Sequence, residues 1–208
     1  RARGSYFLMI TLALAQVVWG IAFGWRTLTG GDDGLPGVPR PTFFISLADD
    51  LSFYYFVLVC VGGASALLVA IVSSPFGHAL RGIRESETRM LALGFDVWRH
   101  QLASFVLAAA FAGLAGALYV YHNKFVSPNF LHVVVSAEAL IMVILGGVGT
   151  LIGPAIGAGL IIFLDDYISS QTQRWLLCLG LIYVATTLFA PRGLIGLYND
   201  HVSRKQKR

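Results

Sequence analysis

The chain has 208 residues, of which 56% are hydrophobic and 12% are charged, and its formal net charge is +4. Its mean hydropathy is +0.72, and a soluble domain of this size carries roughly twice that charged fraction. Composition therefore excludes an ordinary soluble globular domain.

Four stretches contain no Lys, Arg, Asp or Glu at all. They are residues 6–25, 52–73, 101–121 and 175–190, and each is between 16 and 22 residues long. A bilayer core of about 30 Å is crossed by about 20 helical residues. Because these stretches are apolar throughout rather than on one face, we predict an all-α fold, a polytopic bundle of transmembrane helices.

The basic residues are unevenly distributed between the segments that join these stretches. If the chain begins on the cytoplasmic side, segments 1–5, 74–100 and 191–208 lie inside and hold 11 of the 15 Lys and Arg residues. Short cytoplasmic loops of membrane proteins carry such an excess. We therefore predict that both ends of the chain and the segment 74–100 are cytoplasmic.

Between residues 26 and 40 the sequence TGGDDG, at positions 29–34, contains glycines and acids but no Lys. A phosphate or metal site would be weakly supported by this composition, whereas a tight turn is strongly supported. We expect a turn on the outer side.

The segment 74–100 is charged, and its pattern predicts one amphipathic helix. Pro75 suits the first helical turn and Gly94 suits the position after the last one, which gives a cytoplasmic helix of roughly 15 to 18 residues. Its apolar residues fall near one stripe, interrupted by Glu87: Phe76, Leu80, Ile83, Met90 and Leu91.

The charges off this stripe are spaced for ion pairs. Arg81 with Glu85, and Glu85 with Arg89, are four residues apart, and each such pair stabilises a helix by about 0.2–0.5 kcal/mol. The helix could lie on the headgroups, where its arginines would meet anionic lipid. It could also fit a groove on a soluble partner. The residue pattern leaves both alternatives open.

Two shorter apolar pieces, 133–145 and 151–164, flank the sequence GGVGT. Both are short for a full crossing, so they form either two tilted spans or one re-entrant hairpin, and the chain has four to six membrane segments. Gly149, Gly153 and Gly157 recur every four residues, a spacing that lets helices pack closely in lipid. Pro154 suits the first turn of a new helix, so GGVG predicts a break.

A few polar or broken positions within the apolar pieces are candidates for a transport pathway. Glu138 is the one carboxylate inside such a piece, where a charge usually faces a cavity or a partner, although it also lies near enough to the outer end to reach interfacial water. Gln16 is a second candidate, and a hydrogen bond to a neighbouring helix would also account for it. Gly149 and Gly153 flank the predicted break, and non-helical backbone at membrane depth is buried in protein or lines a cavity.

The sequence has no signature of catalysis or of a bound cofactor. The five histidines are scattered without the spacing of metal ligands. A nucleotide-binding loop of the form G-x-x-x-x-G-K-[ST] is absent, and Cys60 and Cys178, both inside apolar stretches, predict no disulfide framework. We expect no enzymatic activity, no metal and no cofactor.

Five stretches, taken in chain order, carry a family resemblance. They are GSYFLMITLALAQ with LTGGDDGL (4–16 and 28–35), SPFGHALRGIRESETRMLALGF (74–95), FVSPNFL (125–131), ILGGVGTLIGPAIGA (144–158) and LFAPRGLIGL (188–197). Together they resemble LivM-type permease subunits of bacterial ABC importers for branched-chain amino acids. Such permeases carry further spans before the part that matches Gly4, so we expect residues 1–208 to form one permease domain that lacks N-terminal spans.

The resemblance implies a multi-pass permease subunit of an ATP-driven importer of leucine, isoleucine and valine in the bacterial inner (cytoplasmic) membrane. Its implied partners are two cytoplasmic ATPase subunits, a second permease subunit, a periplasmic or lipid-anchored substrate-binding protein and membrane lipid, with no nucleic acid. The segment 74–100 would be the coupling loop whose helix sits in a groove of the ATPase. The residues expected to couple are Leu80, Ile83, Arg84, Glu85, Glu87, Met90 and Gly94.

Other functions stay open on the sequence alone. The resembled family also contains urea permeases with a similar loop and a similar LTGG stretch, so a urea or short-amide importer is one alternative. A channel or secondary transporter that uses the break at Gly149 as a filter or binding site is another. A polytopic membrane enzyme would need a nucleophile–base or metal constellation that the sequence does not present.

Overall fold

The computed structural model describes residues 4–40, 49–171 and 180, and it contains three long apolar helices. They are α1 (Ser5–Gly24), α3 (Asp50–Ser73) and α6 (Val97–Asn123), all long and apolar enough to cross a membrane. The spans predicted at 6–25, 52–73 and 101–121 therefore coincide with helices whose ends differ from the predicted ones by at most four residues. The fourth predicted span, 175–190, lies outside the described residues.

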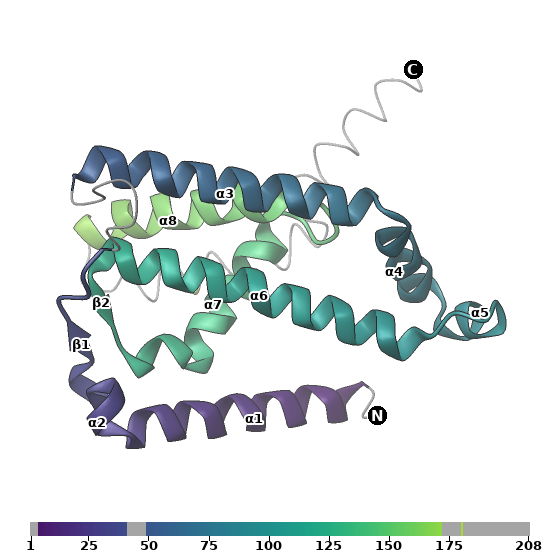
Figure 1. The fold of residues 1–208 in the computed structure, drawn as a ribbon, viewed down its shortest axis with the longest axis horizontal. Helices are drawn as coiled ribbons and strands as arrows, with labels where there is room; N and C mark the ends of the chain where they lie inside the picture. The colour runs from purple at the N-terminus through teal and green to yellow at the C-terminus, as the bar shows by residue number, and fades with distance from the viewer. Residues whose placement is uncertain (1–3, 41–48, 172–179, 181–208) are drawn as a thin grey trace. The chain divides into compact units, whose positions relative to one another are not determined.

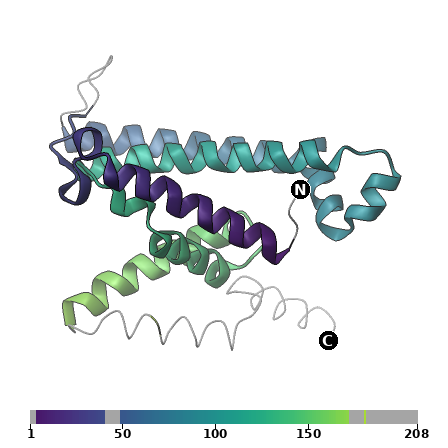
Figure 2. The same cartoon turned by 90° about the horizontal axis from the view of Figure 1, so that it is seen from below.

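The chain divides into two compact units, one built around Trp25–Ser127 and the other from Arg1–Gly24 together with the residues from Pro128 onward. In the first unit, α3 and α6 run in opposite directions, and the short helices α4 (Pro75–Glu85) and α5 (Glu87–Ala92) connect them. In both views α4 and α5 lie together beyond one end of α3 and α6 (Figures 1 and 2).

A short β ladder, which the all-α prediction lacks, lies at the opposite end of this unit. The strand β1 (Leu35–Pro36) pairs antiparallel with β2 (Phe125–Val126), with Leu35 opposite Val126. Each strand has two residues, too few to show an alternating pattern in the sequence. Before β1, the helix α2 (Arg26–Thr29) and the 3₁₀ helix η1 (Gly31–Asp33) form the predicted glycine-rich turn. Gly34 has φ +65°, and a Cβ there would lie 2.6 Å from the carbonyl oxygen of Val126, so this close approach requires glycine.

Charged and aromatic side chains pack together at the same end of the unit as the β ladder. The guanidinium of Arg40, whose side chain is 9% exposed, donates a hydrogen bond of 2.8 Å to the carboxylate of Asp50. It also lies 4.2 Å from the ring centroid of Phe53, a cation–π contact. Phe53 is buried and stacks on His122 with 6.4 Å between ring centroids. Arg40 thus joins the chain after β1 to the first turn of α3, and Phe53 joins α3 to the last turn of α6.

The second unit contains α1, the 3₁₀ helix η2 (Pro128–Leu131), α7 (Val133–Gly146) and α8 (Gly153–Gln171). Trp19 of α1 stacks on Phe23 and meets the edge of His132 at 5.7 Å between centroids. His132 in turn caps α7, because its Nδ1 accepts the backbone N–H of Val134 at 3.4 Å. The first span is therefore anchored to the start of α7.

Helices α7 and α8 form a hairpin with direct backbone contact. A Cβ at Gly146 would collide with the carbonyl of Gly153, and a Cβ at Gly157 would collide with the carbonyl of Met142. The break predicted at GGVG is confirmed, and so is the helix start at Gly153. The four-residue spacing of Gly149, Gly153 and Gly157 would place them on one face only within a continuous helix, and α8 begins at Gly153. Gly149 lies in the turn with φ +97°, and Gly146 provides the third close contact instead.

Gly157→Ala should destabilise this hairpin, whereas Gly159→Ala, two residues along the same helix, should be nearly neutral. The added Cβ at position 157 meets the Met142 carbonyl, and overpacking of this kind costs about 1–3 kcal/mol. A Cβ at position 159 has open space around it in the part of the chain that the structure describes. Thermal unfolding in detergent, followed by tryptophan fluorescence, should show a lower midpoint for Gly157→Ala alone. Equal midpoints for the two variants would contradict the close backbone contact.

Candidate functional site

The segment 74–100 forms two helices instead of the single predicted one. Ser86 has an extended backbone (φ −160°, ψ 102°) between α4 and α5, and its Oγ accepts the backbone N–H of Arg89 at 3.3 Å. A serine side chain that caps a following helix competes with continuation of the preceding one. The spacing of apolar residues did not reveal this break, although Ser is a common N-cap residue.

Each joint of the segment is closed by a side-chain cap. Ser74 separates α3 from α4, and its Oγ donates to the carbonyl of Ile71 at 2.6 Å and accepts the N–H of Gly77 at 3.4 Å. Asp96 caps α6 through the N–H of Arg99 at 3.2 Å and also pairs with the Arg99 side chain at 3.0 Å. Two spans and two short helices therefore meet at joints whose exposed amides are satisfied locally.

The joint between α3 and α4 is tight. Only one residue, Ser74, separates the two helices, and its carbonyl accepts hydrogen bonds from the N–H of His78 at 3.1 Å and from the His78 ring at 2.8 Å. A Cβ at Gly77 would collide with the carbonyl of Val72 and lie 2.7 Å from that of Ile71. The backbones of α3 and α4 therefore touch, which leaves little freedom for one helix to move without the other.

Part of the apolar stripe faces inward, namely Ile83 and Met90, whereas Leu91 at its end is 50% exposed. Together with Ala79 and Val97, Ile83 and Met90 form one buried cluster, each residue between 3% and 8% exposed, that joins α4 and α5 to the first turn of α6. A Cβ at Gly82 would lie 2.8 Å from the sulfur of Met90, so the flexible Met90 side chain packs directly over this glycine.

Aromatic rings reinforce this end of the unit. His100 of α6 stacks on Phe76 of α4 with 5.7 Å between centroids, and Phe95 meets the His100 ring edge-on at 6.0 Å. The aromatic contacts tie α4 and the link before α6 to the first turn of the span. One face of the segment is thus packed against its own protein.

This packing divides the residues expected to couple to an ATPase. Ile83 and Met90 are buried in the cluster, and Leu80 and Glu87 are half-buried. Arg84, Glu85 and Gly94 are exposed. The surface of α4 that a partner could reach is therefore charged rather than apolar.

Two further expectations about this segment have opposite outcomes. Gly94 ends α5 as predicted, with φ +84°, and the N–H of Phe95 donates to the carbonyl of Met90 at 3.1 Å in a Schellman motif. The ion pairs predicted for Glu85 with Arg81 and Arg89 do not form among the described residues. The break at Ser86 removes the helical register that would bring Glu85 to Arg89, so their charges point to solvent.

The pathway candidates lie on three helices of the second unit and in one turn between them. Gln16 is half-buried on α1, and Glu138 is half-buried in the second turn of α7. Gly149 lies in the turn between α7 and α8, and Gly153 is the buried first residue of α8. Three of the four candidates therefore belong to the α7–α8 hairpin.

The sequence analysis missed Thr150, which organises the turn of that hairpin. Its Oγ donates to the carbonyl of Gly147 at 3.0 Å and accepts the N–H of Gly153 at 3.1 Å. The backbone N–H of Thr150 also donates to the Gly147 carbonyl, at 3.4 Å. A threonine three residues before a predicted helix start was the available signal, because such residues favour N-cap positions.

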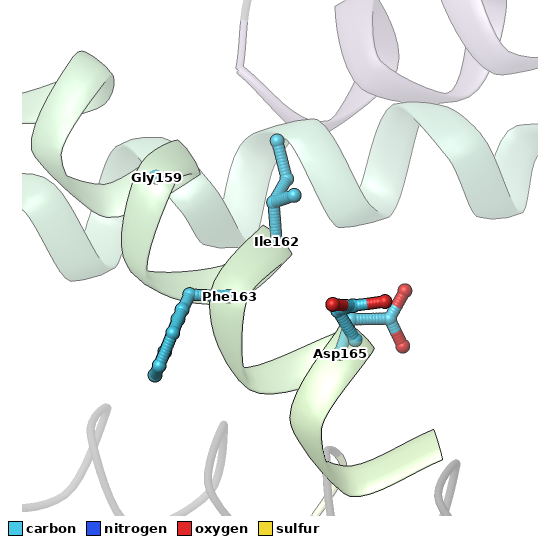
Figure 3. Close-up of a pocket in the computed structure, with 5 residues that line it drawn as sticks. Gly159, Ile162, Phe163 and Asp165 are labelled. Atoms are coloured by element: carbon cyan, nitrogen blue, oxygen red, sulfur yellow. The ribbon is translucent and has the colours of Figure 1, made fainter. Parts of the chain in front are cut away.

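A shallow hollow on α8 contains two carboxylates. Figure 3 shows Asp165 extending from the helix near Gly159, Ile162 and Phe163, and Asp166 completes the lining. One Asp165 oxygen is buried and lacks a hydrogen-bond partner within the described ranges. No group of three metal-binding side chains occurs anywhere in those ranges. Nothing in this hollow identifies a ligand.

Comparison with known proteins relates this chain to membrane permeases. A family model described as "Branched-chain amino acid transport system / permease component" matches residues 1–190. The high-affinity branched-chain amino acid transport system permease proteins LivM of Salmonella typhimurium and Escherichia coli are each 27% identical over 99% of this chain and 54% of their own length. A LivH permease protein of Methanocaldococcus jannaschii is 29% identical over 71% of this chain and 48% of its own length. The chain thus spans about half the length of these curated relatives. No solved structure matches it.

Ile83→Ala should loosen the segment 74–100, because it leaves a cavity in the buried cluster that joins α4 and α5 to α6. Truncation of a buried Ile costs about 2–5 kcal/mol. Limited digestion with trypsin should therefore cleave after Arg84 and Arg89 markedly faster in this variant. Leu91→Ala is the matched control, since Leu91 is 50% exposed, and its digestion should resemble that of the wild type. Unchanged digestion of Ile83→Ala would show that the cluster does not hold the segment.

Proposed function

The chain belongs to the branched-chain amino acid transport system permease family, and we propose that it forms part of the membrane pathway of an ATP-driven importer of leucine, isoleucine and valine. The observation that carries the proposal is the family match over residues 1–190. The three long apolar helices suit a multi-pass transport subunit. In this proposal the chain transports without catalytic activity of its own, in the cytoplasmic membrane of a bacterium.

The proposed partners follow from this role. Two cytoplasmic ATPase subunits supply the energy, a second permease subunit completes the pathway, and a periplasmic or lipid-anchored binding protein delivers the substrate. Residues 74–100 form the cytoplasmic coupling loop of one permease domain. The orientation rests on the basic residues of segments 1–5, 74–100 and 191–208.

In the proposed mechanism α4 is the lever that connects the ATPase to the spans. The joint at Ser74 ties α4 to α3, and the buried cluster of Ala79, Ile83, Met90 and Val97 ties it to α6. A displacement of α4 is therefore passed to two spans at once, because packed interfaces shift between discrete arrangements rather than deform continuously. This supports alternating access driven from the cytoplasmic side.

The contact with the ATPase is proposed to be made by the exposed charges of α4. Arg81, Arg84 and Glu85 are exposed, and none of them has an ion-pair partner among the described residues. Ile83, Met90, Leu80 and Glu87 act indirectly, since they hold the lever in place. Complementary charges at such a rim steer association and set the register of the two surfaces.

Reversal of two of these charges, Arg81→Glu with Arg84→Glu, should uncouple the complex without unfolding the loop. We expect about tenfold less ATPase to co-purify, equivalent to about 1.4 kcal/mol of binding, and ATP-driven leucine uptake into proteoliposomes should fall in parallel. Arg26→Glu is the control, because it makes the same kind of charge reversal, once instead of twice, at an exposed residue on the proposed outer side.

Trypsin resistance after Arg89 should stay normal in the double variant, which separates uncoupling from unfolding. Normal ATPase recovery with normal uptake would contradict the proposed contact. Wild-type proteoliposomes that take up urea but not leucine would overturn the proposed substrate class, and uptake without ATP would overturn the energy source.

A further inference from the structure

The first helix of the α7–α8 hairpin is too short to cross a bilayer. Helix α7 has 14 residues, or about 21 Å at 1.5 Å per residue, whereas the hydrocarbon core is about 30 Å thick. Tilting the helix would only reduce its reach across the membrane. Helix α8 cannot carry the turn further, because its Gly153 and Gly157 are in backbone contact with Gly146 and Met142 of α7.

The turn at the tip is apolar and exposed. Val148 is 59% exposed, Leu151 44% and Ile152 69%. Residues 139–164 contain no charged side chain, and residues 125–173 contain neither Lys nor Arg. A short loop in the cytoplasm would be expected to carry basic residues. The composition of this turn is therefore that of a segment at membrane depth rather than of a cytoplasmic loop.

Several backbone N–H and C=O groups of the turn are hydrogen-bonded within the hairpin itself. The N–H of Gly147 donates to the carbonyl of Val143 at 3.0 Å, and the Gly147 carbonyl accepts from both the N–H and the Oγ of Thr150. The Thr150 Oγ then accepts the N–H of Gly153, the first residue of α8. Away from water, an unpaired backbone group costs several kcal/mol, so a turn with these internal bonds is tolerated at membrane depth far better than an open loop.

From these three observations we propose that the turn 147–152 lies inside the membrane, as the tip of a re-entrant hairpin that lines the substrate route. The last clause rests on the proposed function: non-helical backbone at membrane depth is found where it is buried in protein or lines a water-filled cavity, and in a transporter that cavity is the route. Thr150 is the positioning residue, because its hydroxyl sets the path of the backbone between Gly147 and Gly153.

The position of the tip is tested by cysteine labelling in vesicles that contain the whole transporter complex. Cys60, Cys178 and any other native cysteines are replaced by Ala, and Val148→Cys is compared with Thr88→Cys and Asn123→Cys, two exposed residues on opposite sides of span α6. A bulky polyethylene glycol maleimide is applied from the side on which Thr88→Cys reacts. We expect Val148→Cys to remain unlabelled. Labelling as fast as that of Thr88→Cys would show that the turn emerges from the membrane and would overturn the proposal.

The lining of the route is tested with a small methanethiosulfonate reagent on the same variant. It should reach Val148→Cys through water, and saturating leucine should slow the reaction. Failure to react from either side, or a rate that leucine leaves unchanged, would overturn this part. The comparison is valid in either orientation of the chain. If Thr88→Cys reacted only from the outside, the proposed cytoplasmic coupling loop would be contradicted. The labelling of Val148→Cys would still show whether the turn of the hairpin lies inside the membrane.

The role of Thr150 is tested by transport kinetics. Thr150→Val keeps the shape of the side chain and removes the hydroxyl, whereas Thr150→Ser keeps the hydroxyl. We expect the valine variant to raise the KM for leucine or to abolish uptake at normal membrane abundance, and the serine variant to restore uptake. A valine variant with wild-type KM and rate would show that the hydroxyl does not position the turn.

Discussion

The buried contact among Ala79, Ile83, Met90 and Val97 is the constraint on which the functional end of the first unit depends. These side chains come from α4, α5 and the first turn of α6, so their burial determines where both short helices lie. The cluster is small and has no polar member, which means that its strength comes from removing apolar surface from water. Once it forms, the charged face of α4 can only point away from the spans. The direction of the proposed coupling surface is therefore a consequence of packing.

The two ends of the first unit are secured by different interactions, and this difference suits a lever. At the α4–α5 end, caps at Ser74, Ser86 and Asp96 close every joint, and the apolar cluster fills the space between helices. At the β1–β2 end, the guanidinium of Arg40 bridges Asp50 and Phe53, and a short ladder joins the flanking segments. Short, capped joints resist bending, so in the proposed mechanism a force applied to α4 would reach α3 and α6 instead of being absorbed in a flexible loop. The second unit relies on backbone contact, because small residues are what allow helices to associate in lipid.

The hairpin shows how a single spacing can carry two different meanings. Glycines at 149, 153 and 157 suggested one helix face, but the chain turns at Gly149 and uses Gly146, Gly153 and Gly157 for contact between two helices. Periodicity describes which residues share a face only while the helix continues. The hydrogen bonds of Thr150 to Gly147 and Gly153 decide where it stops, and those bonds depend on the conformation of the turn rather than on the spacing of residues.

Four features could be predicted from the order of residues alone: the three long helices, the charged segment between two of them, the break at GGVG and the stop at Gly94. Each of these is local: continuous apolarity, a run of charges, and glycines that adopt positive φ are visible within a few neighbouring residues. The folded chain was needed to establish that Ile83 and Met90 turn inward and that Ser86 divides the predicted helix. It was also needed to establish that Leu35–Pro36 pairs with Phe125–Val126 and that Arg40 reaches Phe53. An amphipathic pattern predicts that one face of a helix will be buried, but it does not identify the surface that covers this face. The missing information is the identity of the partner surface, which here is provided by the first turn of α6 and becomes available only when the chain folds back on itself.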